Sequence, residues 1–263
     1  MSAARLILHE FRYERRSFQR DPMAVFSTVG LPLLYVVIFV SLFGNETIGF
    51  TLDNQPGPLT AGTVMIANFI AIGVISATFY NLACRLVEAR ENGVLKRFRA
   101  TPLPTWAFIG GHVGTSIALA VGIAALLAAL GRVVYGIPVP LDTLPAFAFV
   151  VVVAAVVFSC LGFAFTVVVR KAGAAVPLGL GLTLTLYFLS GNFIILEDWP
   201  TVIRIVAAIF PVKHLNVALL TALNPHTSGA GIAVRELGIV ALWGLGGLLV
   251  ATRWFRWTPA SGA

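Results

Sequence analysis

The feature that most constrains this chain is a series of apolar runs, each about as long as a membrane is thick. A hydrocarbon core of about 30 Å needs roughly 20 apolar residues in a helix. Five runs meet this length well, at residues 23–43, 61–84, 106–130, 144–169 and 172–196. A sixth run at 232–252 is weaker because Arg235 and Glu236 stand in its first turn, where both side chains can reach toward lipid headgroups. The runs predict an all-α integral membrane protein with six transmembrane helices over residues 23–252.

The composition agrees with lipid as the main solvent. Only 11% of the residues are charged, 58% are hydrophobic and the mean hydropathy is +0.92. A soluble domain has about 25% charged residues, so this chain has too few charges to cover a water-facing surface. The net charge is +7, and the charges stand between the apolar runs. We therefore expect them to meet lipid headgroups and not nucleic acid.

The basic residues alternate between the segments that connect the runs. Fourteen of the 18 lie in alternate segments, at residues 1–22, 85–105, 170–171 and 253–263. The other four are Arg132, Arg204, Lys213 and Arg235. The positive-inside rule places the richer set in the cytoplasm. We therefore expect a multi-pass protein of the cell membrane with both termini cytoplasmic and a short cytoplasmic tail at 253–263.

The first 22 residues predict an amphipathic helix on the cytoplasmic membrane surface. Their apolar residues fall at helical spacing with arginines between them, namely Ala4, Ile7, Leu8, Phe11 and Phe18. Asp21 and Pro22 then end the helix and begin the first span. The alternative is a plain basic anchor that only sets topology. The segment lacks an apolar core followed by a cleavage site, so we do not expect a cleaved signal peptide.

Residues 192–226 are interrupted by helix breakers before the last apolar run. These are Gly191-Asn192, the run Glu197 to Pro200, Pro211 and Asn224-Pro225. The two apolar pieces between them, 202–210 and 215–223, are too short to span a bilayer. The pattern predicts short broken or re-entrant helices on the extracellular side, shielded by protein. An ordinary amphipathic outer loop is the alternative.

The loop after the second run, EARENGVLKRFRATPLP from Glu88, predicts a short cytoplasmic helix over residues 88–101. Val94, Leu95 and Phe98 form an apolar face, with basic residues on the rest. The prolines at 102 and 104 stop the helix. Gly93 inside it suggests a kink or the close approach of another backbone. The alternative is a basic loop that only holds orientation.

The residues from Arg90 to Leu95, followed by Thr101-Pro102, resemble the signature of ABC-2 type transporter permeases. These permeases include the daunorubicin/doxorubicin exporter permeases. Two positions depart from the family pattern: Val94 stands where a hydroxyl is usual, and Lys96 stands where an acid is usual. The second departure puts the charge of the partner surface in question.

This resemblance implies a division of labour. The chain has no G-x-x-x-x-G-K-[ST] phosphate loop, so a separate nucleotide-binding ATPase subunit would hold ATP and Mg. A second permease copy, identical or different, is also implied, and no cofactor, metal or catalytic residue is expected on this chain. The predicted coupling helix would dock on the ATPase through Arg90, Glu91, Gly93, Leu95, Phe98 and Thr101.

Aromatic and amide side chains of the spans are candidates for the substrate path. They are Tyr35, Phe39, Asn68, Phe69, Tyr80, Asn81, Tyr187 and Asn192. If they line a cleft, an aromatic wall with few charges suits an amphipathic drug-like or lipid-like substrate, moved out of the cytoplasm or inner leaflet. The alternative is that they face lipid or pack between helices.

Two rival functions find less support. An ion-coupled secondary transporter places ionisable residues at mid-membrane, and here only His112 is a candidate, more typical of helix packing. An intramembrane enzyme lacks an H-E-x-x-H or G-x-S-x-G motif. Cys84 and Cys160 lack the spacing of a disulfide or zinc site. The glycine-rich stretches 110–114, 179–181 and 244–247 permit close helix packing but are weak evidence for a dimer interface.

Overall fold

The computed structural model describes residues 3–48, 55–99, 105–190 and 200–255. Its helices and strands are α1 (Ala3–Gln19), α2 (Pro22–Val25), η1 (Phe26–Gly30), α3 (Leu31–Phe43), β1 (Thr47–Ile48), β2 (Leu59–Thr60), α4 (Ala61–Ile75), η2 (Ser76–Tyr80), α5 (Asn81–Glu91), α6 (Val94–Arg99), α7 (Thr105–Tyr135), α8 (Leu144–Val168), α9 (Ala172–Leu189), α10 (Thr201–Ile209), α11 (Pro211–Leu223) and α12 (Val234–Trp254). The η segments are wider π-helical turns. The described part is thus almost wholly helical.

Six helical stretches in the described residues are long and apolar enough to cross a membrane. They are Pro22–Phe43, Ala61–Glu91, Phe108–Tyr135, Leu144–Val168, Ala172–Leu189 and Val234–Trp254. The first consists of α2, η1 and α3, and the second of α4, η2 and α5. The predicted all-α membrane fold with six spans is therefore confirmed. The second span is longer than predicted, because its helix continues through the basic residues to Glu91.

The second span is the centre of the bundle. In its most apolar window 83% of the residues are buried within the chain, against 22% for the first, fifth and sixth spans. It packs against the first, third and fourth spans and against α11. The outer spans leave large apolar side chains exposed, such as Leu34, Leu180 and Leu249. In a bilayer these side chains meet lipid, so their exposure carries no hydrophobic penalty.

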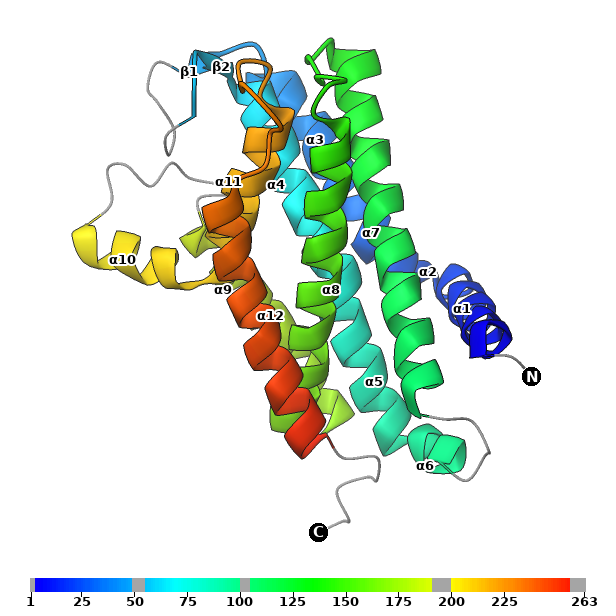
Figure 1. The fold of residues 1–263 in the computed structure, drawn as a ribbon. Helices are drawn as coiled ribbons and strands as arrows, with labels where there is room; N and C mark the ends of the chain where they lie inside the picture. Colours follow the sequence, from blue (N-terminus) through cyan, green and yellow to red (C-terminus); the bar gives the residue numbers. More distant parts are fainter. Residues whose placement is uncertain (1–2, 49–54, 100–104, 191–199, 256–263) are drawn as a thin grey trace.

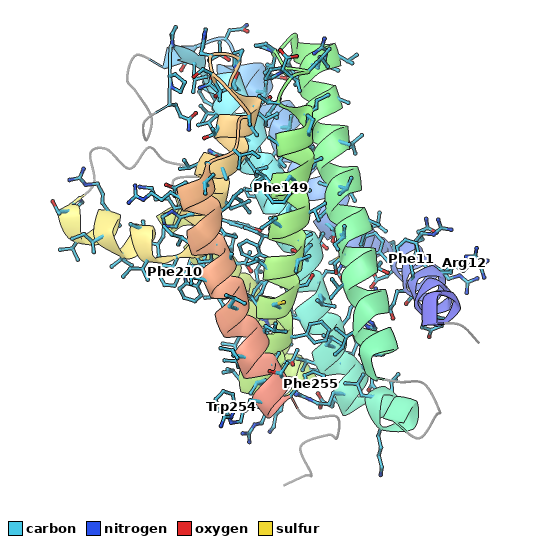
Figure 2. The ribbon with its side chains drawn as sticks, in the orientation of Figure 1. Phe11, Arg12, Phe149, Phe210, Trp254 and Phe255 are labelled. Carbon is cyan, nitrogen blue, oxygen red and sulfur yellow. The ribbon has the colours of Figure 1, made fainter. Side chains whose placement is uncertain are left out.

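The two ends of the bundle differ in construction (Figure 1). At one end, the antiparallel ribbon of β1 and β2 pairs Thr47 with Thr60 and Ile48 with Leu59, and it joins the first span to the second. The connection from α7 to α8 lies at this same end, which we call the ribbon end. The opposite end carries α6, the turn between α8 and α9, and the last turn of α12, where Trp254 is labelled in Figure 2. We call it the α6 end.

A bent pair of short helices precedes the last span. The axes of α10 and α11 meet at 81° at the break before Pro211. Figure 1 shows α10 projecting sideways while α11 returns along the bundle toward the ribbon end. Leu215 and Leu219 of α11 are fully buried, and the helix packs against α4, α8 and α12. The prediction of short broken helices is confirmed. The second one starts at Pro211, earlier than predicted, because proline is favourable in the first turn of a helix.

Glycines allow close contact between α8 and α12. A Cβ on Gly247 would lie 3.1 Å from backbone atoms of Cys160 and Leu161, and one on Gly244 would lie 2.7 Å from a methyl group of Val157. Two glycines of the stretch 244–247 are therefore used for packing inside this chain. They are buried there, so this face of α12 is not available to a second copy.

Candidate coupling site at the end of the second span

The second span ends in a tight turn that separates α5 from α6. The amide of Asn92 donates to Glu88 O at 2.9 Å, and the amide of Gly93 donates to Arg90 O at 3.1 Å. Gly93 has φ +69°, a left-handed conformation that glycine adopts without a Cβ penalty. The single helix predicted over 88–101 is therefore wrong, because Gly93 ends one helix and Val94 begins the next. No described atom lies within 4 Å of a Cβ built on Gly93, so the glycine serves the turn and not a backbone contact.

Arg90 points inward from the last turn of α5. Its side chain is buried, with 4% of the residue exposed. Nη1 donates to the carbonyl oxygen of Thr166 and Nη2 to that of Val169, each at 2.7 Å. Carbonyl groups in the last turn of a helix lack partners within it. The fixed fork of the guanidinium therefore satisfies two acceptors at the C-terminus of α8, where a positive charge is also favourable.

Glu91, the next residue, binds the other side of the same turn. Its carboxylate accepts a hydrogen bond from the amide of Ala172, the first residue of α9. Lys171, the residue before α9, makes no capping hydrogen bond through its own side chain. A negative charge near the start of a helix is stabilising because the first amide groups are unpaired. Arg90 and Glu91 together fasten the end of α5 to both helices of the α8–α9 turn, and we call these contacts the staple.

Leu95 of α6 faces the interior of the chain. It is 1% exposed and packs in a cluster with Leu82, Leu86 and Phe108. Leu95 was predicted to belong to an apolar docking face. In the structure its side chain is buried inside the chain, because the turn at Gly93 directs it toward α5 and α7. Val94, at 38% exposed, and Lys96 are the described side chains that α6 presents outward. The side chain of Phe98 and the whole of Thr101 lie outside the described residues.

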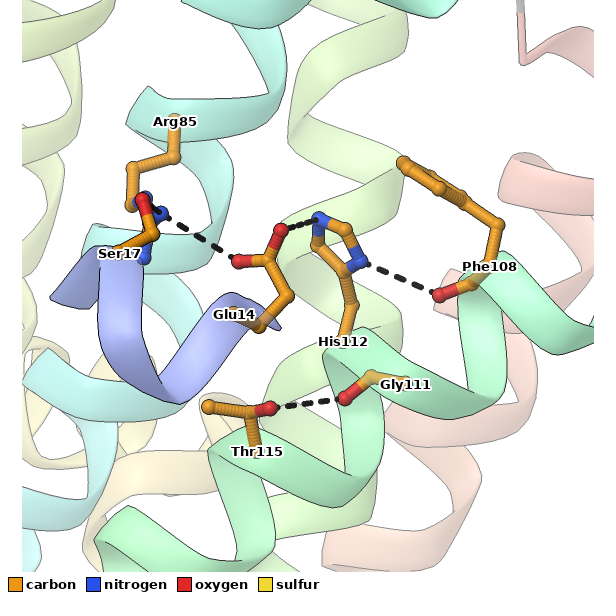
Figure 3. A network of polar contacts seen from close by, with 7 residues as sticks. All are labelled: Glu14, Ser17, Arg85, Phe108, Gly111, His112 and Thr115. Atoms are coloured by element: carbon orange, nitrogen blue, oxygen red, sulfur yellow. Dashed lines mark hydrogen bonds and ion pairs between the residues drawn. The ribbon is translucent and has the colours of Figure 1, made fainter. Parts of the chain in front are cut away.

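A second set of polar contacts holds α1 to the bundle (Figure 3). One carboxylate oxygen of Glu14 lies 3.3 Å from Nη2 of Arg85 in α5, and the other lies 3.5 Å from Nε2 of His112 in α7. Arg85 also donates to the hydroxyl of Ser17 at 2.7 Å, and His112 Nδ1 lies 3.1 Å from the carbonyl oxygen of Phe108. Figure 1 shows α1 at the side of α7, at an angle to the spans.

Sequence reasoning identified the amphipathic helix but missed the role of Glu14. The residue follows Phe11 by three positions and precedes Phe18 by four, so it lies on the apolar stripe of the helix. An acid on such a stripe is the signal that could have revealed it. His112 is buried, as expected of a packing histidine. The α1 contact is therefore partly ionic, and it is more specific than adsorption on a membrane.

Comparison with known proteins gives one decisive result. The sequence model of the family described as ABC-2 type transporter matches residues 6–224. This range runs from α1 to the end of α11 and includes the staple. The chain belongs to the ABC-2 type transporter family. No curated protein matches it closely enough to serve as a relative.

Membership makes this chain a membrane component of a transporter. The ABC-2 resemblance in the segment 90–102 is thereby confirmed at family level. The narrower likeness to daunorubicin/doxorubicin exporter permeases stays a prediction. Among the described residues of this ABC-2 chain, no three His, Cys, Asp or Glu side chains are grouped to hold a metal ion.

Three of the candidate path residues of this ABC-2 transporter form one aromatic group. The ring of Phe69 lies 5.8 Å from that of Tyr35 and 5.6 Å from that of Phe39, between α3 and α4. Phe69 and Asn68 are both buried in the chain. The rings thus contribute packing between the first and second spans. Their exposure to a substrate stays a prediction.

The other candidates of the ABC-2 chain make contacts between spans. Asn81 donates to the hydroxyl of Thr28 at 3.1 Å and so joins α5 to η1. The hydroxyl of Tyr187 donates to the carbonyl oxygen of Ile72 at 3.0 Å and so joins α9 to α4. Tyr80 is half-buried against Gly179 of α9. Asn192 lies outside the described residues.

The bend between α10 and α11 is held by α12 in this ABC-2 chain. The carboxylate of Glu236, in the first turn of α12, contacts Nδ1 of His214 in α11. The other ring nitrogen of His214 lies 2.8 Å from the carbonyl oxygen of Ala208. Trp243 Nε1 donates to the carbonyl oxygen of Ile209 at 2.8 Å. This contact joins residues 22 positions apart in the sequence, and it forms because α11 folds back beside α12.

Proposed function

We propose that this chain is the membrane-spanning permease subunit of an ATP-driven exporter. A separate ATPase subunit would hold ATP and Mg, because the sequence has no phosphate loop of its own. The single observation that carries the proposal is the family match over residues 6–224. The placement of α6 supports it further, since this helix projects at one end of the bundle with Val94 and Lys96 outward.

The α6 end is proposed to be cytoplasmic, together with both termini. The basic residues support this orientation. Those gathered at the α6 end include Arg90, Lys96, Arg170, Lys171 and Arg253. The ATPase would then meet α6 and the polar side of α1 from the cytoplasm, and its closure on ATP would bias the permease toward an outward-facing state. A second permease copy, identical or different, would complete the assembly.

An amphipathic drug-like or lipid-like substrate is the proposed cargo. Tyr35 and Phe39, which are half-buried, support it, because neutral aromatic surface suits such molecules better than sugars or ions. An apolar cavity of about 400 Å³ between α7 and α8, with Arg132 at its lining, also fits contact with lipid acyl chains. We expect membrane lipids to be partners of this surface.

The first experiment is co-expression of this chain with a candidate ATPase subunit from the same genome, followed by a test of whether the two co-purify. Leu95→Asp is a poor probe of docking, because Leu95 is buried and its loss would damage the chain itself. We therefore choose the double variant Val94→Asp, Lys96→Glu, which alters the exposed side of α6. Arg204→Glu on α10 is the matched control, since it also reverses an exposed charge but lies far from α6.

We expect an active ATPase to co-purify with wild type and with the Arg204→Glu variant. The α6 double variant should lose most of the bound ATPase. If no ATPase accompanies the wild type, the ATP-driven function is contradicted. The alternative, an ion-coupled secondary transporter, would then be tested by uptake into vesicles with an imposed ion gradient. Equal recovery with all three forms would instead move the docking surface away from α6.

A further inference from the structure

α6 is the helix proposed to contact the ATPase, and it packs on the end of α5. The staple connects that end of α5 to the turn between α8 and α9. We propose that Arg90 and Glu91 are positioning residues that make the α8–α9 turn move together with α6. This inference rests on the proposed function and deepens it. It assigns the two residues to contacts inside the chain, where the family resemblance alone suggested docking on the ATPase.

α6 is connected rigidly to α5. Leu95 packs into a cluster that contains Leu82 and Leu86 of α5, together with Phe108 of α7. The intervening turn is short and closed by two backbone hydrogen bonds. Because a packed contact of this kind has little freedom to slide, a displacement of α6 carries the end of α5 with it.

The charged contacts of the staple connect α5 to α8 and α9. Arg90 holds two carbonyl groups at the end of α8, and Glu91 holds the first amide of α9. A cation at a helix C-terminus and an anion at a helix N-terminus are both the favourable arrangement. Two adjacent residues of opposite charge therefore bind the two sides of the α8–α9 turn. A rotation of α5 would then act on both α8 and α9.

Among the described residues, the fifth span has few other attachments. Only 22% of the residues in its apolar window are buried. Val169 and Ala175 pack on Val87 of α5 near the staple. Farther along, the hydroxyl of Tyr187 binds the second span again at Ile72. The fifth span is thus tied to the second near both of its ends, so we infer that the two move as one body.

Hydrogen exchange measured by mass spectrometry tests this inference on the complex with its ATPase. The comparison is between nucleotide-free complex and complex with Mg and a non-hydrolysable ATP analogue. Peptides covering α6 and the α8–α9 turn report the two regions separately. Glu91→Ala removes the acceptor for the Ala172 amide. Glu91→Gln keeps an acceptor oxygen, and Glu88→Ala removes an exposed acid one turn earlier on the same helix.

In wild type we expect nucleotide to change exchange in both regions. In the Glu91→Ala variant the Ala172 amide should exchange about tenfold faster without nucleotide, because it has lost a hydrogen bond to a charged group. Its α6 peptide should still respond to nucleotide, whereas the response of the turn should fall to half or less. Glu91→Gln should restore most of that response, and Glu88→Ala should match wild type.

A turn that responds equally in Glu91→Ala and in wild type overturns the inference, and so does a wild-type turn that never responds while α6 does. A merely structural role would raise the basal exchange of Ala172 and leave the nucleotide response of the turn unchanged. Failure of the proposed function gives a different result: no ATPase accompanies the wild type, or α6 itself does not respond to nucleotide. That result overturns both proposals.

Discussion

Replacing Gly247 by alanine should weaken the packing of α12 on α8. A Cβ at this position would lie 3.0 Å from Leu161 Cδ2 and 3.1 Å from two backbone atoms of the same stretch. Side-chain atoms could shift, but the backbone of α8 cannot move without disturbing its own hydrogen bonds. The neighbouring Gly246 is exposed, and no described atom lies within 4 Å of a Cβ built there. The two positions are therefore a matched pair on one helix.

The expected magnitude follows from two opposing effects. Alanine is favoured over glycine in a helix interior by about 1 kcal/mol, and this gain applies equally at both positions. Overpacking a close contact costs about 1–3 kcal/mol, and this cost applies only to Gly247→Ala. We therefore expect Gly246→Ala to be neutral or stabilising, and Gly247→Ala to have a free energy of unfolding lower than Gly246→Ala by about 1–3 kcal/mol.

The assay is unfolding of the purified chain in mixed micelles with increasing SDS, followed by far-ultraviolet circular dichroism. Gly244→Ala provides a second test, because its Cβ would lie 3.3 Å from the backbone of Val157. Gly238, whose Cβ meets no described atom within 4 Å, provides a second control. Equal unfolding free energies for Gly247→Ala and Gly246→Ala would refute the reasoning, because the α8–α12 contact would then not depend on the missing Cβ.

Three further predictions concern polar contacts that are buried or partly buried. Tyr187→Phe should lower the free energy of unfolding by about 1 kcal/mol, because the hydroxyl that binds Ile72 O is lost. Asn224→Ala should cost about 1–3 kcal/mol in the same assay, because the buried amide joins the residues before β2 to the end of α11. Glu14→Gln should speed hydrogen exchange in α1, because the carboxylate no longer attracts Arg85.

Each of these predictions has a control at a more exposed contact or side chain. Tyr135→Phe removes a hydroxyl whose hydrogen bonds are exposed, and it should change stability less than Tyr187→Phe. Asn92→Ala is the control for Asn224→Ala, and Glu88→Gln is the control for Glu14→Gln. Both controls alter exposed side chains. A control that changes stability or exchange as much as its buried counterpart would contradict the corresponding prediction.

The spans could be predicted because their signal is local. A helix that crosses a bilayer must satisfy every backbone group internally and present about 20 apolar residues in succession, and this requirement is written in the order of residues. The breakers around Pro211 are equally local, since proline lacks an amide hydrogen and fixes the backbone. The broken pair α10–α11 was therefore predictable, although its 81° bend was not.

The contacts of the candidate site could not be predicted in the same way. Arg90 and Glu91 look like exposed members of a basic loop until the α8–α9 turn comes beside them, and their partners lie 76 to 81 positions along the chain. Leu95 likewise has an apolar side chain that suits either a docking face or the interior. Only the left-handed turn at Gly93 decides which way it points.

The sequence by itself thus determined the membrane environment, the number of spans and the family motif, because each depends on neighbouring residues or on a short fixed spacing. The tertiary structure decided that the second span is central, that two glycines of α12 pack against α8, and that the motif's charged pair binds inside the chain. Those outcomes depend on which helix surfaces meet. Helices of nearly uniform apolar composition carry little pattern that distinguishes one neighbour from another.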